Sequence, residues 1–200
     1  MTIQTDHERE RKTKWRTLAL AAGALTGLYL WWRKSGDSSR APLSGYRKRT
    51  YSNLGEIIAD ISFMFNNRGK IRQAMQTLDP TLVERLMLAV TQVNDCRYCS
   101  QYHAQLALRG GLGQEEINAI LNGTVDHCPP QHATAILYAQ HWADTDGHPD
   151  PEARRKLVET YGADQAAAIE VPLHMIKMGN YMGNTFDYLL HRLSGGRWGQ

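Results

Sequence analysis

The apolar residues of this chain recur at helical spacing from residue 54 onward. Leu54, Ile57, Ile58, Ile61 and Phe65 follow one another at i, i+3, i+4, i+7 and i+11, which places them on one face of an α-helix. No segment alternates polar and apolar residues for long enough to predict a strand. We therefore expect an all-α domain.

Proline and glycine mark the ends of the expected helices. Asp79 and Pro80 supply an N-cap and a first-turn proline. Asn94-Asp95 breaks that helix and is expected to cap a next one that begins at Cys96 and stops at Gly110-Gly111. Further helices are expected from Gly113 to Gly123, from Ala133 to Asp144, from Asp150 to Gly162, and from Ala163 to about Leu193, where Pro172 should kink or restart the helix.

Charge is distributed unevenly along the chain. Residues 1–50 carry 11 Lys and Arg against 4 Asp and Glu, whereas the remainder carries 12 against 16. A nucleic-acid-binding domain would have its basic residues on the folded part, so this distribution argues against nucleic acid as a partner. It is typical of a basic segment that lies against anionic lipid headgroups.

An uncharged segment follows that basic start. Residues 17–32 contain no charge, and Trp15 and Trp31-Trp32 flank them as interfacial anchors would. The segment is close to the minimum length for a membrane span, and we expect a single-pass anchor over residues 15–34. A cleaved signal peptide lacks a suitable site after the apolar run, and a helix packed on a protein partner is the other alternative.

The chain is therefore expected to have four parts. These are a basic N-terminus with its anchor (residues 1–34), a linker rich in Ser, Gly and Pro (35–49), a helical domain (50–195) and a short tail (196–200). Three cysteines, two of them closely spaced, indicate redox or metal chemistry in a reducing compartment. The domain is accordingly expected to face the cytoplasm from a membrane anchor.

Two thiols and an imidazole form the motif that carries chemistry. Cys96, Cys99 and His103 stand at i, i+3 and i+7, which share one helix face. A helix N-terminus favours a thiolate at Cys96, and His103 can exchange a proton with Cys99, its i+4 neighbour. Glu84 lies on the preceding helix, and packing of the two helices would bring its carboxylate to the His103 ring.

This motif predicts a redox cycle that needs no added cofactor. A C-x-x-C turn brings two sulfurs within bonding distance, so Cys96 and Cys99 can form a reversible disulfide. One thiolate would attack a peroxide or disulfide, the second thiol would displace the product, and an external dithiol would reduce the pair.

The chain resembles the alkyl hydroperoxidase D-like proteins of the carboxymuconolactone decarboxylase superfamily. The shared pattern is Glu, eleven residues, C-x-x-C, three residues, His, represented here by Glu84, Cys96, Cys99 and His103. Residues 83–121 resemble the family core, and residues 179–193 resemble the end of its single-domain members.

The resemblance implies an all-α fold and protomers that assemble into trimers or hexamers. It implies thiol peroxidase or disulfide reductase activity, with Cys99 meeting peroxide, His103 and Glu84 assisting, and Cys96 exchanging with a thioredoxin-like or lipoyl dithiol reductant. The helix N-terminus instead favours Cys96 as the thiol of lower pKa, which leaves the division of labour open. The decarboxylase branch lacks the dithiol.

Two departures from the family pattern stand out. The founding peroxidases carry a His directly before the second Cys, whereas this chain has Tyr98 there. A phenol keeps its proton at neutral pH, so peroxide turnover is expected to be slower. The N-terminal anchor is also absent from the family pattern.

Other functions are compatible with the same residues. One is a non-enzymatic accessory subunit that docks on a larger membrane complex through its N-terminal helix. Another is a metal site built from Cys96, Cys99, His103 and Glu84, although structural zinc usually takes its ligands from two separated pairs. Cys128, next to Pro129, is interpreted as a loop thiol without a redox role.

Overall fold

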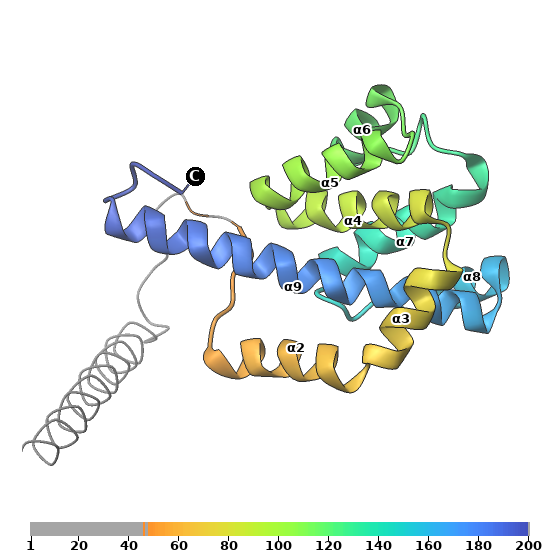
Figure 1. Ribbon diagram of the computed structural model, residues 1–200, viewed down its shortest axis with the longest axis horizontal. Coiled ribbons are helices and arrows are strands. Elements are labelled where there is room, and N and C mark those ends of the chain that lie inside the picture. The colour runs from red at the N-terminus through yellow and green to blue at the C-terminus, as the bar shows by residue number, and fades with distance from the viewer. Residues whose placement is uncertain (1–45, 47, 200) are drawn as a thin grey trace, which may run out of the picture. The chain divides into compact units, whose positions relative to one another are not determined.

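The chain is helical throughout the part that the computed structural model describes, residues 46 and 48–199. The chain divides into two compact units, Met1–Gly45 and Tyr46–Gln200, and the second contains every described residue. Its helices are α2 (Leu54–Asn66), α3 (Arg68–Thr77), α4 (Pro80–Asn94), α5 (Arg97–Arg109), α6 (Gln114–Leu121), α7 (Pro130–Asp144), α8 (Pro151–Tyr161) and α9 (Ala163–Leu193) (Figure 1). The all-α prediction is confirmed for these residues.

No helix within residues 46 and 48–199 is both long enough and apolar enough to cross a bilayer. The anchor expected at residues 15–34 lies outside the described residues.

Helix α4 is the central element of the core. Its start follows the prediction, because the Asp79 carboxylate accepts a hydrogen bond from the Thr81 backbone N–H and Pro80 occupies the first turn. The helix packs against α5, α6, α7 and α9, so little of its surface faces water. Leu86, Leu88, Ala89 and Val90 are all fully buried, so more than one side of the helix is covered.

Helix α9 extends along the whole domain (Figure 1) and contacts α2, α3, α4, α5, α7 and α8. It runs without a break for 31 residues through the buried Pro172, so the restart offered as one outcome there does not occur. A proline removes one backbone donor and crowds the preceding turn. Burial of this turn against neighbouring helices stabilises the helical path despite those costs.

One helix was absent from the sequence prediction, and another begins earlier than expected. Helix α3 was not predicted, because the run Arg68–Thr77 buries only Ala74 and so lacks a broad apolar face. Helix α7 begins at Pro130, three residues before the expected start, with that proline in its first turn.

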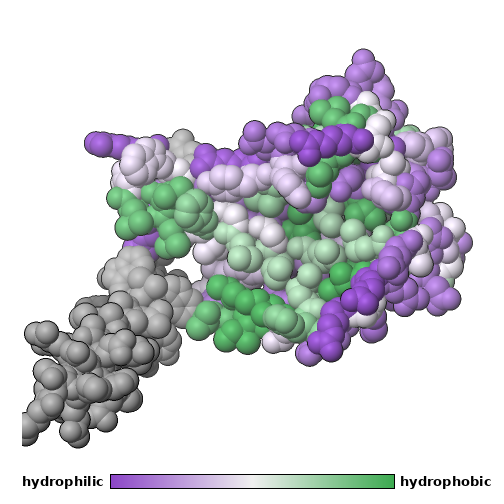
Figure 2. Space-filling view, viewed as in Figure 1, coloured by the Kyte–Doolittle hydropathy of each residue, from purple (hydrophilic) through white to green (hydrophobic). Residues whose placement is uncertain are grey.

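The apolar face of α2 was predicted as a helical stripe, and the helix forms as expected. None of its residues is buried. Figure 2 shows this helix as one apolar area on the surface and the C-terminal part of α9 as another. Their exposed apolar side chains are Leu54, Ile58, Ile61 and Phe65 on α2, and Met182, Phe186, Leu189 and Leu193 on α9.

Candidate active site

Cys96 stands between two helices and caps the second of them. Asp95 ends α4 in the left-handed conformation (φ 52°, ψ 45°), and α5 begins at Arg97. The prediction that Asn94-Asp95 caps α5 was therefore wrong: Cys96 is itself the N-cap, and its Sγ accepts the Cys99 backbone N–H at 3.4 Å. This position aims the unpaired amides of the first turn at the sulfur.

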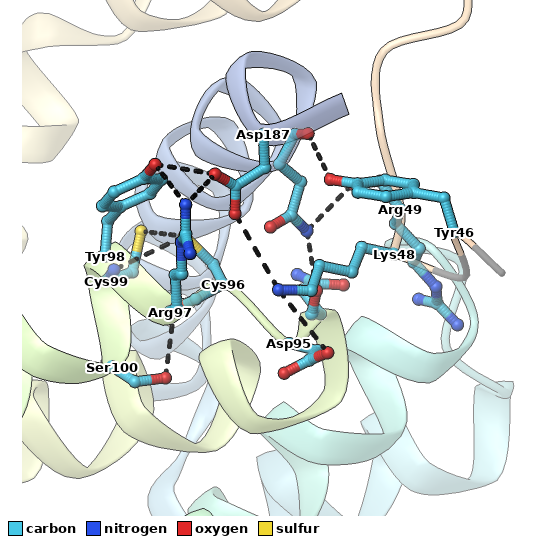
Figure 3. Close-up of polar contacts among 12 residues, drawn as sticks. Tyr46, Lys48, Arg49, Asp95, Cys96, Arg97, Tyr98, Cys99, Ser100 and Asp187 are labelled. Atoms are coloured by element: carbon cyan, nitrogen blue, oxygen red, sulfur yellow. Dashed lines mark hydrogen bonds and ion pairs between the residues drawn. The ribbon is translucent and has the colours of Figure 1, made fainter. Parts of the chain in front are cut away.

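The two sulfurs lie side by side. Cys96 and Cys99 are both free thiols, and their Sγ atoms are 2.8 Å apart (Figure 3). The hydrogen bond with Cys99 is the main cause that lowers the pKa of Cys96 from 9.0 to about 7, aided by two backbone amides and the charge of Lys48, against the effect of burial. The same hydrogen bond, and then burial, raise the pKa of Cys99 far above its ordinary range. One proton is therefore shared between two sulfurs near neutral pH, and it resides mainly on Cys99.

His103 and Glu84 meet as the sequence predicted. The Glu84 carboxylate on α4 lies 2.9 Å from Nδ1 of His103 on α5. Their side chains are only 19% and 13% exposed, so the contact is largely shielded from water. Because Glu84 engages Nδ1, it fixes the ring orientation and leaves proton exchange to Nε2.

A pocket of about 420 Å³ opens beside Cys99. Cys99 and His103 both line it, whereas Cys96 does not and is fully buried. The remaining lining side chains are mostly apolar, and they are Met87, Tyr98, Tyr102, Met175 and Ile176, with Gly179. A substrate that enters this pocket meets the sulfur of Cys99 and the imidazole together.

A buried carboxylate lies on the other side of the dithiol, and sequence reasoning missed it. The Asp187 side chain on α9 is fully buried. Its Oδ1 accepts a hydrogen bond from the Tyr98 hydroxyl at 2.6 Å and one from Arg97 at 2.7 Å (Figure 3). Both donors belong to the first turn of α5, so Asp187 ties that turn to α9. The only sequence signal was its spacing from Asn180 and Asn184, which form a polar stripe on a buried helix face.

The third thiol lies apart from this site. Cys128 is half-buried against the core, and burial raises its pKa to about 11. It therefore carries its proton at neutral pH. Within residues 46 and 48–199, no group of three or more His, Cys, Asp or Glu is arranged to hold a metal ion.

The glutamate, dithiol and histidine thus lie together in one continuous stretch from α4 to α5. Residues 62–141 match the model of the carboxymuconolactone decarboxylase family. This stretch begins within α2, ends within α7 and contains Glu84, Cys96, Cys99 and His103. The carboxymuconolactone decarboxylase match supports the superfamily that the motif indicated, which includes alkyl hydroperoxidase D-like members. Lys48 and Asp187 lie outside the matched stretch. No curated protein matches the chain.

Proposed function

We propose that the chain is a dithiol oxidoreductase that reduces hydroperoxides, with Cys96 and Cys99 cycling between dithiol and disulfide. The observation that carries the proposal is the contact between the two sulfurs at 2.8 Å, with one sulfur lining an apolar pocket and the other buried. Such a pair divides the reaction into an accessible step and a protected step. The match to the carboxymuconolactone decarboxylase family is compatible with this activity but does not specify it.

In the first step, Cys99 attacks the hydroperoxide. The proton that the pair shares moves to Cys96, and the Cys99 thiolate attacks the outer oxygen of ROOH. The O–O bond breaks, Cys99 becomes a sulfenic acid, and the alkoxide takes a proton from Nε2 of protonated His103. Sulfur is oxidised by two electrons and the peroxide is reduced to ROH.

In the second step, Cys96 attacks the sulfur of the sulfenic acid. The S–O bond breaks, the disulfide forms, and the departing hydroxide takes the Cys96 proton to give water. The balance is one ROOH and two thiols converted into ROH, water and one disulfide. The position of Cys96 at the N-cap of α5 suits it to this attack, because the first-turn amides favour its thiolate, which is the nucleophile.

In the third step, an external dithiol restores the pair. We propose a thioredoxin-like or lipoyl dithiol protein as the donor. Its thiolate attacks the accessible Cys99 sulfur and expels Cys96 as a thiolate, and its second thiol then releases Cys99. Thiols of lower pKa are better leaving groups, and the first-turn amides of α5 favour the Cys96 thiolate, so Cys96 is suited to this departure as well.

Single-cysteine variants test the assignment. With an organic hydroperoxide and dithiothreitol as donor, Cys99→Ser should abolish hydroperoxide consumption by the reduced full-length protein. Cys96→Ser should instead retain one round of oxidation, and dimedone should then label a sulfenic acid at Cys99. Cys128→Ser is the matched control and should behave as the unmodified protein. Unchanged consumption by Cys99→Ser would overturn the proposal.

The exposed apolar residues support a homo-oligomer, proposed as a trimer or hexamer. Phe65 and Ile58 on α2 are 68% and 55% exposed, and an apolar stripe of this kind is typical of a subunit interface. Light scattering of the purified protein tests this, since Phe65→Glu should shift the mass toward the monomer. A monomeric unmodified protein would contradict it.

We also propose that residues 15–34 attach the chain to a membrane with the domain facing the cytoplasm. The support is a basic segment followed by a run of residues without charge. Fractionation of cells that express the full chain tests the membrane attachment.

A further inference from the structure

A short segment before α2 lies along α9 next to the dithiol, and we call residues 46 and 48–51 the strap. The Tyr46 hydroxyl donates a hydrogen bond to the Asn184 backbone carbonyl, and the Tyr51 backbone N–H donates to the Thr185 hydroxyl at 3.0 Å. The Asn184 side chain returns a hydrogen bond to the backbone of the strap at 3.0 Å. The strap is thus attached to α9 at both ends.

Lys48 is the residue of the strap that points toward the dithiol turn. Its ammonium nitrogen lies 3.9 Å from a carboxylate oxygen of Asp187 and 3.9 Å from one of Asp95 (Figure 3). The Lys48 side chain is 11% exposed, Asp187 is fully buried and Asp95 is 76% exposed. Water screens exposed charges more than buried ones, so Asp187 is the counter-charge that matters.

Asp187 has one oxygen for the first turn of α5 and one for Lys48. Its Oδ1 accepts from Tyr98 and Arg97, whereas Oδ2 is buried and has no hydrogen-bond partner among the described residues. A buried carboxylate oxygen without a hydrogen bond is costly unless a cation balances it. The Lys48 ammonium is placed to do so.

We propose that Lys48 is a positioning residue of the dithiol, whose ammonium group, held in place by Asp187, stabilises the thiolate of Cys96. The use of this thiolate in the reaction rests on the proposed function, since a stabilised thiolate favours both the attack by Cys96 and its departure. The charge state of Cys96 itself does not depend on that function.

Several charged or titratable groups face Cys96, and they come from every element packed against it. They are Lys48 and Tyr46 of the strap, Asp95 of the turn, Arg97, Tyr98 and Cys99 of α5, and Asp187 of α9. Asp187 accepts from Arg97 at 2.7 Å and lies 3.9 Å from the Lys48 ammonium, so one buried carboxylate faces two cations and one positive charge remains beside the dithiol turn. This remaining charge favours the Cys96 thiolate, in agreement with the effect of Lys48 on the pKa of Cys96.

The test measures the thiolate directly. Thiolate absorbance in the far ultraviolet is followed against pH for the reduced full-length protein, with Cys96→Ser as baseline, because a buried thiol reacts poorly with alkylating reagents. Lys48→Met should lower the thiolate fraction at neutral pH by about two- to threefold. Lys48→Arg keeps the positive charge and should keep most of the thiolate fraction. Lys48→Gln removes the charge but has a polar side chain, and it should lower the thiolate fraction as Lys48→Met does.

Two comparisons make the result specific. Lys156→Met, which removes a lysine from α8, should leave the titration unchanged. The midpoint potential of the dithiol in glutathione buffers should become more negative in Lys48→Met, because a less stable thiolate disfavours the reduced form. An unchanged titration in both neutral variants, or a loss in Lys48→Arg equal to that in Lys48→Met, would overturn the inference. Neither readout requires peroxide turnover, so failure of the proposed function would be seen separately.

Discussion

Gly183 of α9 lies so close to Cys96 of the α5 cap that a Cβ atom at position 183 would come within 2.9 Å of Sγ. Alanine normally stabilises a helix interior relative to glycine by about 0.5–1 kcal/mol. Here the added methyl group must push the sulfur aside, because such a contact is shorter than carbon and sulfur tolerate. The glycine is therefore a spacing device for the dithiol.

Gly183→Ala should slow closure of the disulfide by about tenfold, because a shift of about 1 Å between reacting atoms has effects of this size or larger. The rate is measured by adding a small disulfide oxidant, quenching with an alkylating reagent and counting modified cysteines by mass spectrometry. Gly69→Ala on α3 is the control, since a Cβ there meets nothing within 4 Å and Gly69 does not line the Cys99 pocket. Equal rates in the two variants would contradict the role given to Gly183.

The shared proton predicts how stability of the reduced protein changes with pH. Folding lowers the pKa of Cys96 from 9.0 to about 7, so its contribution is complete above pH 9 and is lost as the pH falls through 7. Folding raises the pKa of Cys99, so its contribution is present below pH 9 and is lost at higher pH. Between pH 7 and pH 9 the unfolded chain binds more protons than the folded one, and the free energy of unfolding should rise.

Chemical denaturation in the presence of a phosphine reductant checks this. The unmodified protein should gain stability over that interval relative to Cys96→Ser, which lacks the titrating thiol. A parallel pH dependence in the two proteins would show that Cys96 does not titrate in this interval.

Much of the fold follows from local signals in the sequence. Asp79 and Pro80 mark the start of α4, and Gly162 marks the end of α8, because capping chemistry involves only neighbouring residues. Helix α3 was missed because it buries a single alanine. The period of α2 predicts its helix, but not whether another element covers its apolar face, since that depends on packing partners far along the chain.

The site shows the same division between local and distant contacts. Cys96, Cys99 and His103 lie within two turns, and Glu84 is one helix away, so spacing was enough to bring them together. Asp187 bonds Arg97 across 90 positions, and Lys48 approaches from before the first described helix. No periodic pattern links such positions, and an isolated Lys or Asp is far more often a surface residue.

The Glu84–His103 pair predicts a loss of turnover without a loss of the thiolate. Glu84→Gln keeps the size of the side chain but removes the charge that fixes the tautomer and ring orientation. Hydroperoxide reduction should fall by about 10- to 100-fold, less than the roughly 10²- to 10⁴-fold of a full general acid–base effect, because the imidazole itself remains. Steady-state consumption with dithiothreitol as donor measures this, and far-ultraviolet titration of the Cys96 thiolate should remain unchanged. A matching loss of thiolate would assign Glu84 to the dithiol instead of to His103.

The ion pair between Arg85 of α4 and Glu116 of α6 should dominate the electrostatic part of stability. Arg85 Nε lies 2.6 Å from Oε1 of Glu116 and Nη2 lies 3.2 Å from Oε2, and their side chains are only 7% and 11% exposed. Glu116→Ala leaves a buried guanidinium without its carboxylate, which should cost about 3–5 kcal/mol. Arg155 and Glu159 on α8 give a matched control, because both are 67% exposed and their charged atoms are 3.6 Å apart.

Glu159→Ala should therefore change the free energy of unfolding by no more than about 0.5 kcal/mol. Urea denaturation of both variants measures the difference, with the denaturant slope checked for equality so that the midpoints are comparable. The dithiol lies at the start of α5 and not in the contact between α4 and α6, so the folded fraction of Glu116→Ala should keep the Cys96 titration of the unmodified protein. Equal destabilisation of the two variants would mean that burial adds nothing to the Arg85–Glu116 pair, and that the contact between α4 and α6 depends on its apolar residues alone.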